Sequence, residues 1–405
     1  MLALAPQNDR PWRTPAEWWP RLASATDGVE PPYGVLAVEA LAANAFDMLE
    51  RAQGTPIRVA SKSVRVRGVL DAVLALPGFH GILAYTLPEA LWLAETHDDV
   101  VVGYPTADRA AIARLGADEV LASRVTLMVD SLEHLDYIDA VVAPAKRATI
   151  RVCLELDASY RAPVLGHVGV RRSPVHEAAD AEALAAEIVR RPGFALVGMM
   201  AYEAQIAGVG NKGVGKLAIR AMQKASAAEL RERRGAAVAA VRRVAELEFV
   251  NGGGTGSLES THADPAVTEI AAGSGLFGPL LFDGYEHFRP APAASFVLSV
   301  VRRPTPDIAT VLGGGWIASG PPGQDRLPRP VWPEGLGYLA REEAGEVQTP
   351  VRGDAARELR VGDRVFFRHV KAGEVSEHLD EFVLVEDGRI QGRIPTYRGE
   401  GKVFL

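Results

Sequence analysis

The sequence predicts an α/β protein in which a (β/α)8 barrel of the TIM type is followed by an all-β C-terminal domain. The first observation is an alternation of short apolar runs with Ala- and Leu-rich helical runs from about residue 55 to 275, which is typical of βα units and a parallel sheet. The second is the number of units, because eight of them in about 220 residues fit a closed barrel. The third is a change of composition after about residue 290, where helical patterns end. A doubly wound open sheet is the alternative for the first part.

Each predicted barrel strand is a short apolar run. The eight runs are Ile57–Ala60, Gly81–Ala84, Val100–Gly103, Val125–Val129, Thr149–Glu155, Ala195–Met200, Phe249–Asn251 and Val267–Ala271. Between them, helical segments such as PEALWLAET and AEALAAEIVRR repeat apolar residues at steps of three and four. The longest helical pattern, KASAAELRERRGAAVAAVRRVAE, precedes the seventh strand. This order assigns residues 51–290 to the barrel.

The C-terminal part carries strand patterns without helices. The runs are SFVLSVVRR, DRVFFRHV and EFVLVEDGRI, and prolines cluster in RPAPAA and GPPGQDRLPRPVWPEG. We therefore assign residues 291–405 to a separate β domain. In the N-terminal segment, residues 1–50, the run Gly34–Val38 precedes a helical pattern and is expected to join that β domain.

Composition limits the class of function. The chain has 405 residues, of which 48% are hydrophobic and 23% charged, as in a globular protein that buries a large core without cross-links. Its formal net charge of −7 argues against nucleic acid or an anionic membrane as partner. The single cysteine, Cys153, excludes an internal disulfide and a multi-cysteine zinc site and is expected to be inert core. No signal peptide or membrane-spanning run is evident, so we expect a cytoplasmic protein.

A lysine stands at the end of the first predicted barrel strand. In IRVASKSVR, Lys62 follows the apolar run by two residues, at the C-terminal mouth where barrel enzymes carry their catalytic groups. The neighbouring Arg58, Arg65 and Arg67 would lower the pKa of a partly desolvated lysine and favour a Schiff base. From this segment alone, a solvated lysine at a strand end is the alternative.

Two glycine-rich loops follow the seventh and eighth predicted strands. The first is Gly252–Ser257 and the second is Gly273–Gly275. Glycines let backbone N–H groups converge on an anion, and barrels often form a phosphate site from the loops at these two places. Each loop alone could be a tight turn, but both loops together with Lys62 predict a phosphate site.

These motifs resemble the D-threonine aldolase and D-serine dehydratase family. Its members are fold-type III pyridoxal-phosphate enzymes, built like alanine racemase from an α/β barrel and a β domain. The resemblance covers roughly residues 30–400. It is carried by PYGVLAVEALAANAFDML, the lysine strand, EA in LPEALWLA, LELD, NGGGTGS, the spacing from Glu269 to Ser274, and DGRI with IPTYRG. The glycine loop is the most specific of these segments.

The resemblance implies pyridoxal 5′-phosphate bound to Lys62 as an internal aldimine. The implied cofactor contacts are Arg172, with Arg171 as the adjacent alternative, and Gly253, Gly254, Thr255, Gly256, Gly273, Ser274 and Gly275. Arg172 matches an arginine beside the phenolic oxygen of the cofactor. Tyr202 and Glu203 match a polar position that faces the substrate. The family also implies a homodimer in which the β domain of one subunit covers the barrel mouth of the other.

Two positions depart from the family patterns. Ala271 stands where alanine racemases place an arginine against the pyridine nitrogen, which weakens a racemase interpretation. The aldolases and dehydratases bind a divalent metal through His-x-Cys or His-x-Asp, whereas here His369 is followed by Lys371. We expect an enzyme without this metal, in which the Lys371 ammonium replaces the charge of the metal. The alternative is a metal on His369, or on His378 with Asp380, since residues i and i+2 of a strand share a face.

The resemblance favours a lyase that acts on small β-hydroxy D-amino acids, as an aldolase or as a dehydratase (deaminase). Both reactions need a base and a polar group near the β-hydroxyl. The candidate catalytic residues are Lys62, His369, Lys371 and Tyr202. An amino-acid racemase and a non-catalytic pyridoxal-phosphate-binding protein are the alternatives, and the β domain counts against the second of these.

Overall fold

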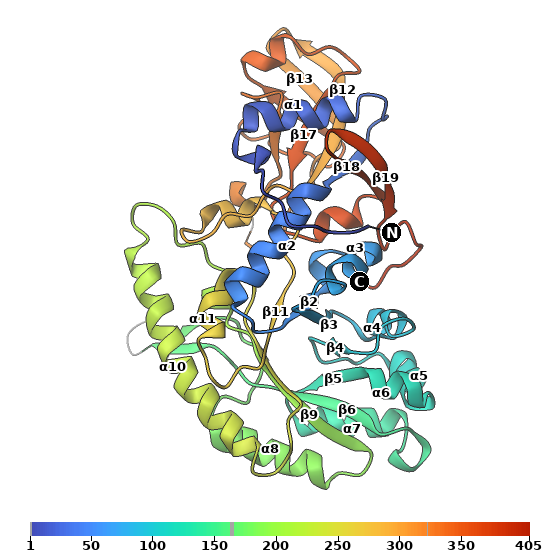
Figure 1. Cartoon of the computed structure of the whole chain (residues 1–405), viewed down its shortest axis with the longest axis vertical. Helices are drawn as coiled ribbons and strands as arrows, with labels where there is room; N and C mark the ends of the chain where they lie inside the picture. Colours follow the sequence, from blue (N-terminus) through green and yellow to red (C-terminus); the bar gives the residue numbers. More distant parts are fainter. Residues whose placement is uncertain (1, 163–165, 322) are drawn as a thin grey trace. The chain divides into compact units, whose positions relative to one another are not determined.

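The computed structural model describes residues 2–162, 166–321 and 323–405 (Figure 1). The chain forms two compact units that are interleaved in sequence. The unit that we call the β unit contains the described residues up to Asp47, together with Ser63–Val73 and Ser274–Val403. The unit that we call the barrel unit contains Met48–Lys62, Leu74–Gly273 and Phe404–Leu405.

The barrel unit is built around a closed barrel of eight parallel strands. The strands are β2 (Ile57–Ala60), β3 (Phe79–Ala84), β4 (Val100–Val102), β5 (Val125–Val129), β6 (Ile150–Glu155), β9 (Phe194–Ala201), β10 (Phe249–Gly252) and β11 (Glu269–Ala272). Each strand pairs with the next in this order, and β11 returns to β2 with Ala272 opposite Val59. The predicted barrel is thus confirmed, and the open-sheet alternative is wrong.

Helices connect the barrel strands. Those of the barrel unit are α4 (Leu87–Leu93), α5 (Arg109–Ala117), α6 (Glu119–Arg124), α7 (Leu132–Val141), α8 (Ala178–Arg190), α9 (Ala204–Ala207), α10 (Leu217–Val241) and α11 (Leu258–His262). Local polar residues fix where several of them begin. The Asp108 carboxylate accepts a hydrogen bond from the N–H of Ala111 and caps α5. The α8 and α10 helices lie side by side (Figure 1).

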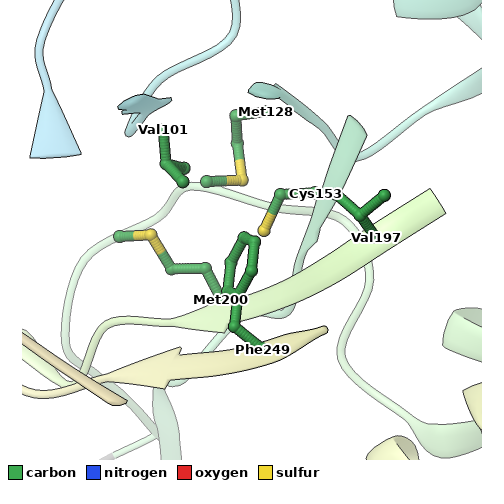
Figure 2. Packing of buried hydrophobic residues seen from close by; sticks show 6 residues of the cluster. All are labelled: Val101, Met128, Cys153, Val197, Met200 and Phe249. Carbon is green, nitrogen blue, oxygen red and sulfur yellow. The ribbon is translucent and has the colours of Figure 1, made fainter. Parts of the chain in front are cut away.

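Apolar side chains fill the barrel interior (Figure 2). The cluster consists of Val101, Met128, Cys153, Val197, Met200 and Phe249, which come from β4, β5, β6, β9 and β10. Because these strands are successive in the barrel, their inward side chains meet and pack as a core. Cys153 is fully buried here, and this burial raises the pKa of its thiol well above the usual range. That environment suits the inert role expected for Cys153.

The β unit contains a nine-stranded sheet that combines both ends of the chain. Its strands are β1 (Tyr33–Ala37), β12 (Ala294–Thr305), β13 (Ile308–Leu312), β14 (Arg329–Trp332), β15 (Gly337–Tyr338), β16 (Gln348–Arg352), β17 (Arg364–Arg368), β18 (Glu381–Glu386) and β19 (Arg389–Pro395). The β1 strand lies between β12, to which it is antiparallel, and β18, to which it is parallel. The helices of this unit include α1 (Pro15–Ala25), the first part of α2 (Val38–Ala52), and most of α3 (Arg67–Leu74).

The segment Ser63–Val73 belongs to the β unit because its backbone is hydrogen-bonded there. The carbonyl of Val64 accepts a bond from the Ser376 hydroxyl at 2.8 Å. The carbonyl of Arg65 accepts a bond from the N–H of Tyr397 at 2.9 Å. In the part of the chain that the structure describes, no helix is long and apolar enough to cross a lipid bilayer.

Candidate active site at the C-terminal end of the barrel strands

Lys62 lies directly after the first barrel strand, in the short 3-10 helix η2 (Ser61–Ser63). Its Nζ donates a hydrogen bond to the phenolic oxygen of Tyr104 at 2.7 Å and lies 5.4 Å from the centre of the same ring. Tyr104 follows β4 by two residues, as Lys62 follows β2. Tyr104 was not predicted from the sequence, where its signal would have been an aromatic hydroxyl just past a strand end.

Arg172 lies between two tyrosine rings at this mouth. Its guanidinium carbon is 5.2 Å from the ring centre of Tyr104 and 4.9 Å from that of Tyr202, which are distances of cation–π contacts. One Arg172 nitrogen lies 3.6 Å from a carboxylate oxygen of Glu155, at the end of β6. The structure therefore brings Arg172, rather than its neighbour Arg171, beside Tyr202.

The two phenols differ in their acidity. Burial disfavours ionisation of Tyr104, but the charges of Lys62 and Arg172 outweigh it and lower the pKa of Tyr104. Burial of Tyr202 raises its pKa to about 12, although Arg172 partly opposes this effect. Tyr202 is therefore a neutral hydroxyl near pH 7, whereas Tyr104 can ionise more easily than an ordinary tyrosine.

Glu155 is a buried carboxyl group in the same set. Its burial raises the pKa to about 7, and the nearby Asp130 and Asp157 add to this effect while Arg172 opposes it. A carboxyl group with such a pKa can hold or release a proton near neutral pH.

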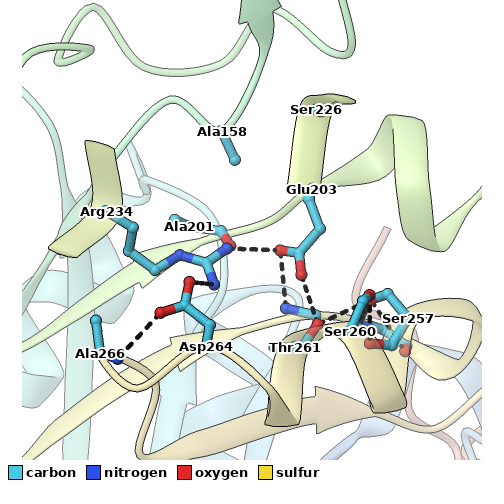
Figure 3. A network of polar contacts seen from close by, with 12 residues as sticks. Ala158, Ala201, Glu203, Ser226, Arg234, Ser257, Ser260, Thr261, Asp264 and Ala266 are labelled. Atoms are coloured by element: carbon cyan, nitrogen blue, oxygen red, sulfur yellow. Dashed lines mark hydrogen bonds and ion pairs between the residues drawn. The ribbon is translucent and has the colours of Figure 1, made fainter. Parts of the chain in front are cut away.

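The first glycine loop begins at the end of β10 and is held from behind by Glu203. One carboxylate oxygen of Glu203 accepts hydrogen bonds from the N–H of Gly253 and from Arg234, both at 3.0 Å. The other accepts a bond from the Thr261 hydroxyl at 2.6 Å (Figure 3). Glu203 is only 2% exposed, so its carboxylate positions the loop. The sequence had instead suggested that Glu203 faces a substrate. Arg234 also forms an ion pair with Asp264 at 3.0 Å.

Backbone crowding explains two of the glycines in this loop. Gly253 has φ +78°, and a Cβ there would lie 2.8 Å from Thr261 Oγ1 and from an Ile270 methyl carbon. At Gly254, a Cβ would lie 3.0 Å from Ala207 Cβ and 3.4 Å from the Tyr202 ring. The loop backbone thus passes beside the Tyr202 ring.

The remaining residues of the loop form the 3-10 helix η4 (Thr255–Ser257), in which Thr255, Gly256 and Ser257 are all buried. The Ser257 hydroxyl accepts a hydrogen bond from the N–H of Gly254 at 3.1 Å. The carbonyl of Thr255 accepts a bond from Arg51 at 2.7 Å, and Arg51 also pairs with Glu259 at 2.6 Å. The loop conformation is thus fixed by side chains outside it.

The second glycine loop begins where β11 meets β2. A Cβ on Gly273 would lie 2.5 Å from the carbonyl oxygen of Ala60, so the two backbones approach closely at this point. Ala60 precedes Lys62 by two residues, which places Gly273 beside the lysine strand. Ser274 and Gly275 continue the chain into the β unit.

Contacts therefore connect Lys62 through Tyr104, Arg172 and Tyr202 to the first glycine loop. This donor set fits pyridoxal phosphate: Lys62 offers a primary amine, the loops offer closely approaching glycine backbone, and Arg172 offers a positive charge. The arginines expected to act on Lys62 are instead engaged with carboxylates. Arg58 pairs with Glu269 at 2.7 Å, Arg65 with Glu377 at 2.5 Å and Arg67 with Glu400 at 2.5 Å.

His369 and Lys371 lie in the β unit, just after β17. His369 is buried, and its ring is nearly perpendicular to that of Phe277, with the ring centres 6.4 Å apart. Burial and the adjacent Arg368 lower its pKa to about 3. The Nζ of Lys371 donates a hydrogen bond to the Ser319 hydroxyl at 3.4 Å.

The second possible metal pair lies outside the strands, so the argument that residues i and i+2 of a strand share a face does not apply to it. His378 follows the 3-10 helix η8 (Glu374–Glu377), and its ring stacks on Trp316 with the centres 4.6 Å apart. Asp380 precedes β18, and its carboxylate accepts a hydrogen bond from Arg398 at 3.1 Å. Over residues 2–162, 166–321 and 323–405, no three His, Cys, Asp or Glu side chains form a group that could hold a metal ion. These residues therefore do not fit a three-ligand metal site.

Comparison with known proteins agrees with this architecture. The family described as "Alanine racemase, N-terminal domain" matches residues 36–280. D-threonine aldolase from Filomicrobium marinum has a TM-score of 0.77 and 20% identity, over 93% of this chain and 96% of that chain. D-threo-3-hydroxyaspartate dehydratase from Delftia sp. HT23 has a TM-score of 0.70 and 20% identity, over 91% and 98%. Alanine racemase from Corynebacterium glutamicum has a TM-score of 0.56 and 18% identity, over 84% and 90%.

At these identities, the likeness to solved structures shows the fold alone. No curated protein matches the chain in sequence. The geometry at the barrel mouth is therefore the main basis for assigning chemistry.

Proposed function

The chain belongs to the alanine racemase N-terminal domain family, and from this premise we propose that it is a pyridoxal-phosphate-dependent lyase for β-hydroxy D-amino acids. The observation that carries the proposal is the connected set of Lys62, Tyr104, Arg172 and Tyr202 beside a glycine loop at the C-terminal end of the barrel. The aldolase and the dehydratase named above support the lyase class over the racemase class.

Particular residues would hold the cofactor. Lys62 would bind its aldehyde carbon, and the loops Gly252–Ser257 and Gly273–Gly275 would surround its phosphate. Arg172 would face its phenolic oxygen, because a guanidinium suits a negatively charged oxygen. When bound, the cofactor supplies an electron sink for the negative charge that develops at the substrate Cα.

Side chains of the protein would then accept and donate the protons of the reaction. An amine must lose a proton before it can act as a nucleophile, and the Tyr104 oxygen lies 2.7 Å from the Lys62 nitrogen. The lowered pKa of Tyr104 suits it to take up that proton and return it. Tyr202 would remain protonated and donate a hydrogen bond, while Glu155 would hold a proton close to Arg172.

In the dimer that the family resemblance implies, groups from the β unit of one subunit would act on the β-hydroxyl of a substrate held by Lys62 of the other subunit. With its pKa lowered to about 3, His369 is a neutral and weakly basic imidazole near pH 7, so it supplies no positive charge there. We assign the positive charge to Lys371, whose ammonium has three donors to stabilise a developing alkoxide. Loss of the β-hydroxyl proton leads to aldol cleavage, whereas loss of the hydroxyl itself leads to dehydration.

Spectra and product analysis test this proposal. The purified protein should show visible absorbance from a lysine-bound cofactor, and borohydride should fix that cofactor covalently. Incubation with D-threonine, D-serine and D-threo-3-hydroxyaspartate should give either glycine with an aldehyde or an oxo acid with ammonia. Racemised substrate without either product pair would instead assign a racemase. Absence of both the absorbance and a borohydride adduct would refute the cofactor.

A further inference from the structure

A basic pocket lies next to Arg172 in the barrel unit. After β6, the chain forms a hairpin of β7 (Tyr160–Ala162) and β8 (Gly166–Val168), which the sequence analysis did not predict. A cavity of about 670 Å³ is formed beside it. Its lining includes Asp157, Arg161, His167, Arg171, Arg172 and Ser173.

The segment that leads into the hairpin is fixed by two buried polar side chains. Arg233, from α10, donates hydrogen bonds to the carbonyl oxygens of Asp157 at 2.7 Å and Ser159 at 2.9 Å. Gln205 donates a bond to the carbonyl of Ala158 at 2.7 Å. Since Arg233 and Gln205 are both buried, the start of the hairpin is held by the barrel unit and the pocket wall is a built feature.

The pocket carries an excess of positive charge, because Arg161, Arg171 and Arg172 line it together with a single carboxylate. Its one carboxylate, Asp157, accepts hydrogen bonds from the N–H and the hydroxyl of Ser159 at 2.9 and 2.7 Å. Within the described ranges, neither Arg161 nor Arg171 has a carboxylate partner. Arg161 stands opposite His167 across the hairpin, so the two side chains share a face. The Nε2 atom of His167 is buried and has no hydrogen-bond partner among those same residues.

Arg172 joins this pocket to the candidate active site, because it lines the cavity and also contacts the ring of Tyr104, the partner of Lys62. A substrate held at Lys62 could therefore extend toward Arg161 and Arg171. Guanidinium groups match a carboxylate with paired hydrogen bonds. We infer that the pocket binds the distal carboxylate of the substrate, so that the preferred substrates are dicarboxylic β-hydroxy amino acids. This inference rests on the proposed function for the position of the substrate.

A specificity measurement tests the inference. For the wild type, kcat/KM for D-threo-3-hydroxyaspartate should exceed that for D-threonine. In the double variant Arg161→Gln, Arg171→Gln, the ratio of the two values should fall by about 10-fold, as expected for two exposed charge contacts. Arg190→Gln is the control, since Arg190 is an exposed arginine of α8 that pairs with Glu187. An unchanged ratio in the double variant would overturn the inference.

A binding measurement separates this inference from the lyase assignment. The cofactor-loaded protein is titrated calorimetrically with succinate, with butyrate and with inorganic phosphate. Succinate should bind more tightly than butyrate, and the double variant should lose the difference while Arg190→Gln keeps it. Equal binding of succinate and butyrate would overturn the inference, as would phosphate binding more tightly than succinate. If no β-hydroxy amino acid is converted, the lyase assignment fails, and this titration still decides whether the pocket takes a carboxylate.

Discussion

At the scale of single residues, the mouth of the barrel places two tyrosines around one arginine. Arg172 contacts both rings, but only Tyr104 also receives the ammonium of Lys62, and this second charge lowers its pKa. Tyr202 lacks that ammonium and is buried beside Glu203, so its pKa rises to about 12. Two groups of the same type are thus prepared for different tasks, one as proton acceptor and one as donor.

Replacing Tyr104 tests the first of these tasks. Tyr104→Phe should lower kcat by about 100-fold, because a positioned proton acceptor typically contributes at least that factor. The wild-type rate should rise with pH as the Tyr104 phenol ionises, since its pKa is lowered below the usual value. In the variant, that rise should disappear from the profile of kcat against pH.

Tyr137→Phe is the matched control for this change. Tyr137 lies in α7, and its hydroxyl donates a hydrogen bond to the carbonyl of Ala107 at 2.7 Å. A profile with the same rising limb in Tyr104→Phe as in the wild type would exclude Tyr104 as the proton acceptor.

The glycine loop provides a second prediction at the same scale. Gly253→Ala should weaken cofactor binding at least about 10-fold, because the left-handed φ of +78° and the 2.8 Å approach to Thr261 force the loop to move. Thr261 is hydrogen-bonded to Glu203, so a displaced Thr261 also disturbs the carboxylate that holds the loop. The measurement is a titration of the cofactor-free protein by absorbance.

Gly54→Ala separates backbone strain from loop displacement. Gly54 has φ +91° in the same unit, but a Cβ there would have no neighbouring atom within 4 Å. This variant should lose stability to strain yet keep its cofactor affinity. Equal affinities for Gly253→Ala and the wild type would remove the loop from the proposed phosphate site.

Single site residues could be predicted best from the sequence where a residue lies a short, clear distance after the end of an apolar strand. Lys62 follows a short apolar strand, and the structure places it at the strand end that the spacing indicated. Tyr104 follows an even shorter strand, but a lone aromatic residue carries no distinctive chemistry in a sequence. Glu203 was expected to face the substrate, but its carboxylate accepts hydrogen bonds from Gly253 and Thr261. Only the fold shows these contacts.

At the scale of elements, one buried ion pair joins the first and last barrel strands. Arg58 of β2 bonds both carboxylate oxygens of Glu269 of β11, at 2.7 and 2.9 Å, and both residues are about 2% exposed. Asn251 of β10 adds a hydrogen bond to Glu269 at 2.8 Å. Because β2 and β11 are far apart in the sequence, this pair helps to specify where the barrel closes.

Removing the charge of Glu269 should destabilise the barrel. Glu269→Gln leaves the buried Arg58 with only the partly exposed Asp99 as counterion. Loss of one partner of a buried ion pair typically costs about 3–5 kcal/mol of unfolding free energy. Urea unfolding followed by circular dichroism measures the difference, with Glu187→Gln, which breaks an exposed pair on α8, as the control.

The same pair has a defined pH dependence. Burial opposes ionisation of Glu269, but His80, Arg58 and Asn251 outweigh it and lower the pKa to about 2 from the ordinary 4.5. The stabilisation is therefore complete above about pH 4.5 and is lost as the pH falls toward 2. The difference in stability between the wild type and Glu269→Gln should shrink over this range, and a constant difference would contradict the assigned pKa.

The hydrophobic pattern of the sequence predicted some strands well and missed others. All eight barrel strands were predicted because a strand buried on both faces is a continuous apolar run. The hairpin of β7 and β8 was missed, since YRA and GHV are short and polar. The β14 and β15 strands were also missed, because prolines and glycines dominate their segment, and β14 pairs with β17 and not with a neighbour in the sequence.

At the scale of the whole molecule, the chain order and the spatial order differ. The β1 strand enters a sheet whose other strands all follow residue 293, and Ser63–Val73 returns to the same unit from within the barrel sequence. The sequence could suggest that Gly34–Val38 belongs with the C-terminal strands through its apolar pattern. It could not show the return of Ser63–Val73, which depends on hydrogen bonds to Ser376 and Tyr397 more than 300 residues later.

The last prediction concerns assembly. The family resemblance implies a homodimer in which the β domain of one subunit completes the site of the other, and a two-fold dimer then has two equivalent shared sites. Lys62→Ala and Lys371→Ala should each be nearly inactive, the second with cofactor binding retained. Co-expressed with different tags, the two variants should form mixed dimers in which one site carries both substitutions and the other carries neither. The isolated mixed dimer should therefore recover about half of the wild-type turnover. Light scattering should give the mass of a dimer, and wild-type subunits with the same two tags provide the control. If the mixed dimer stays inactive while each variant remains folded and dimeric, Lys371 does not act in the site of the partner subunit.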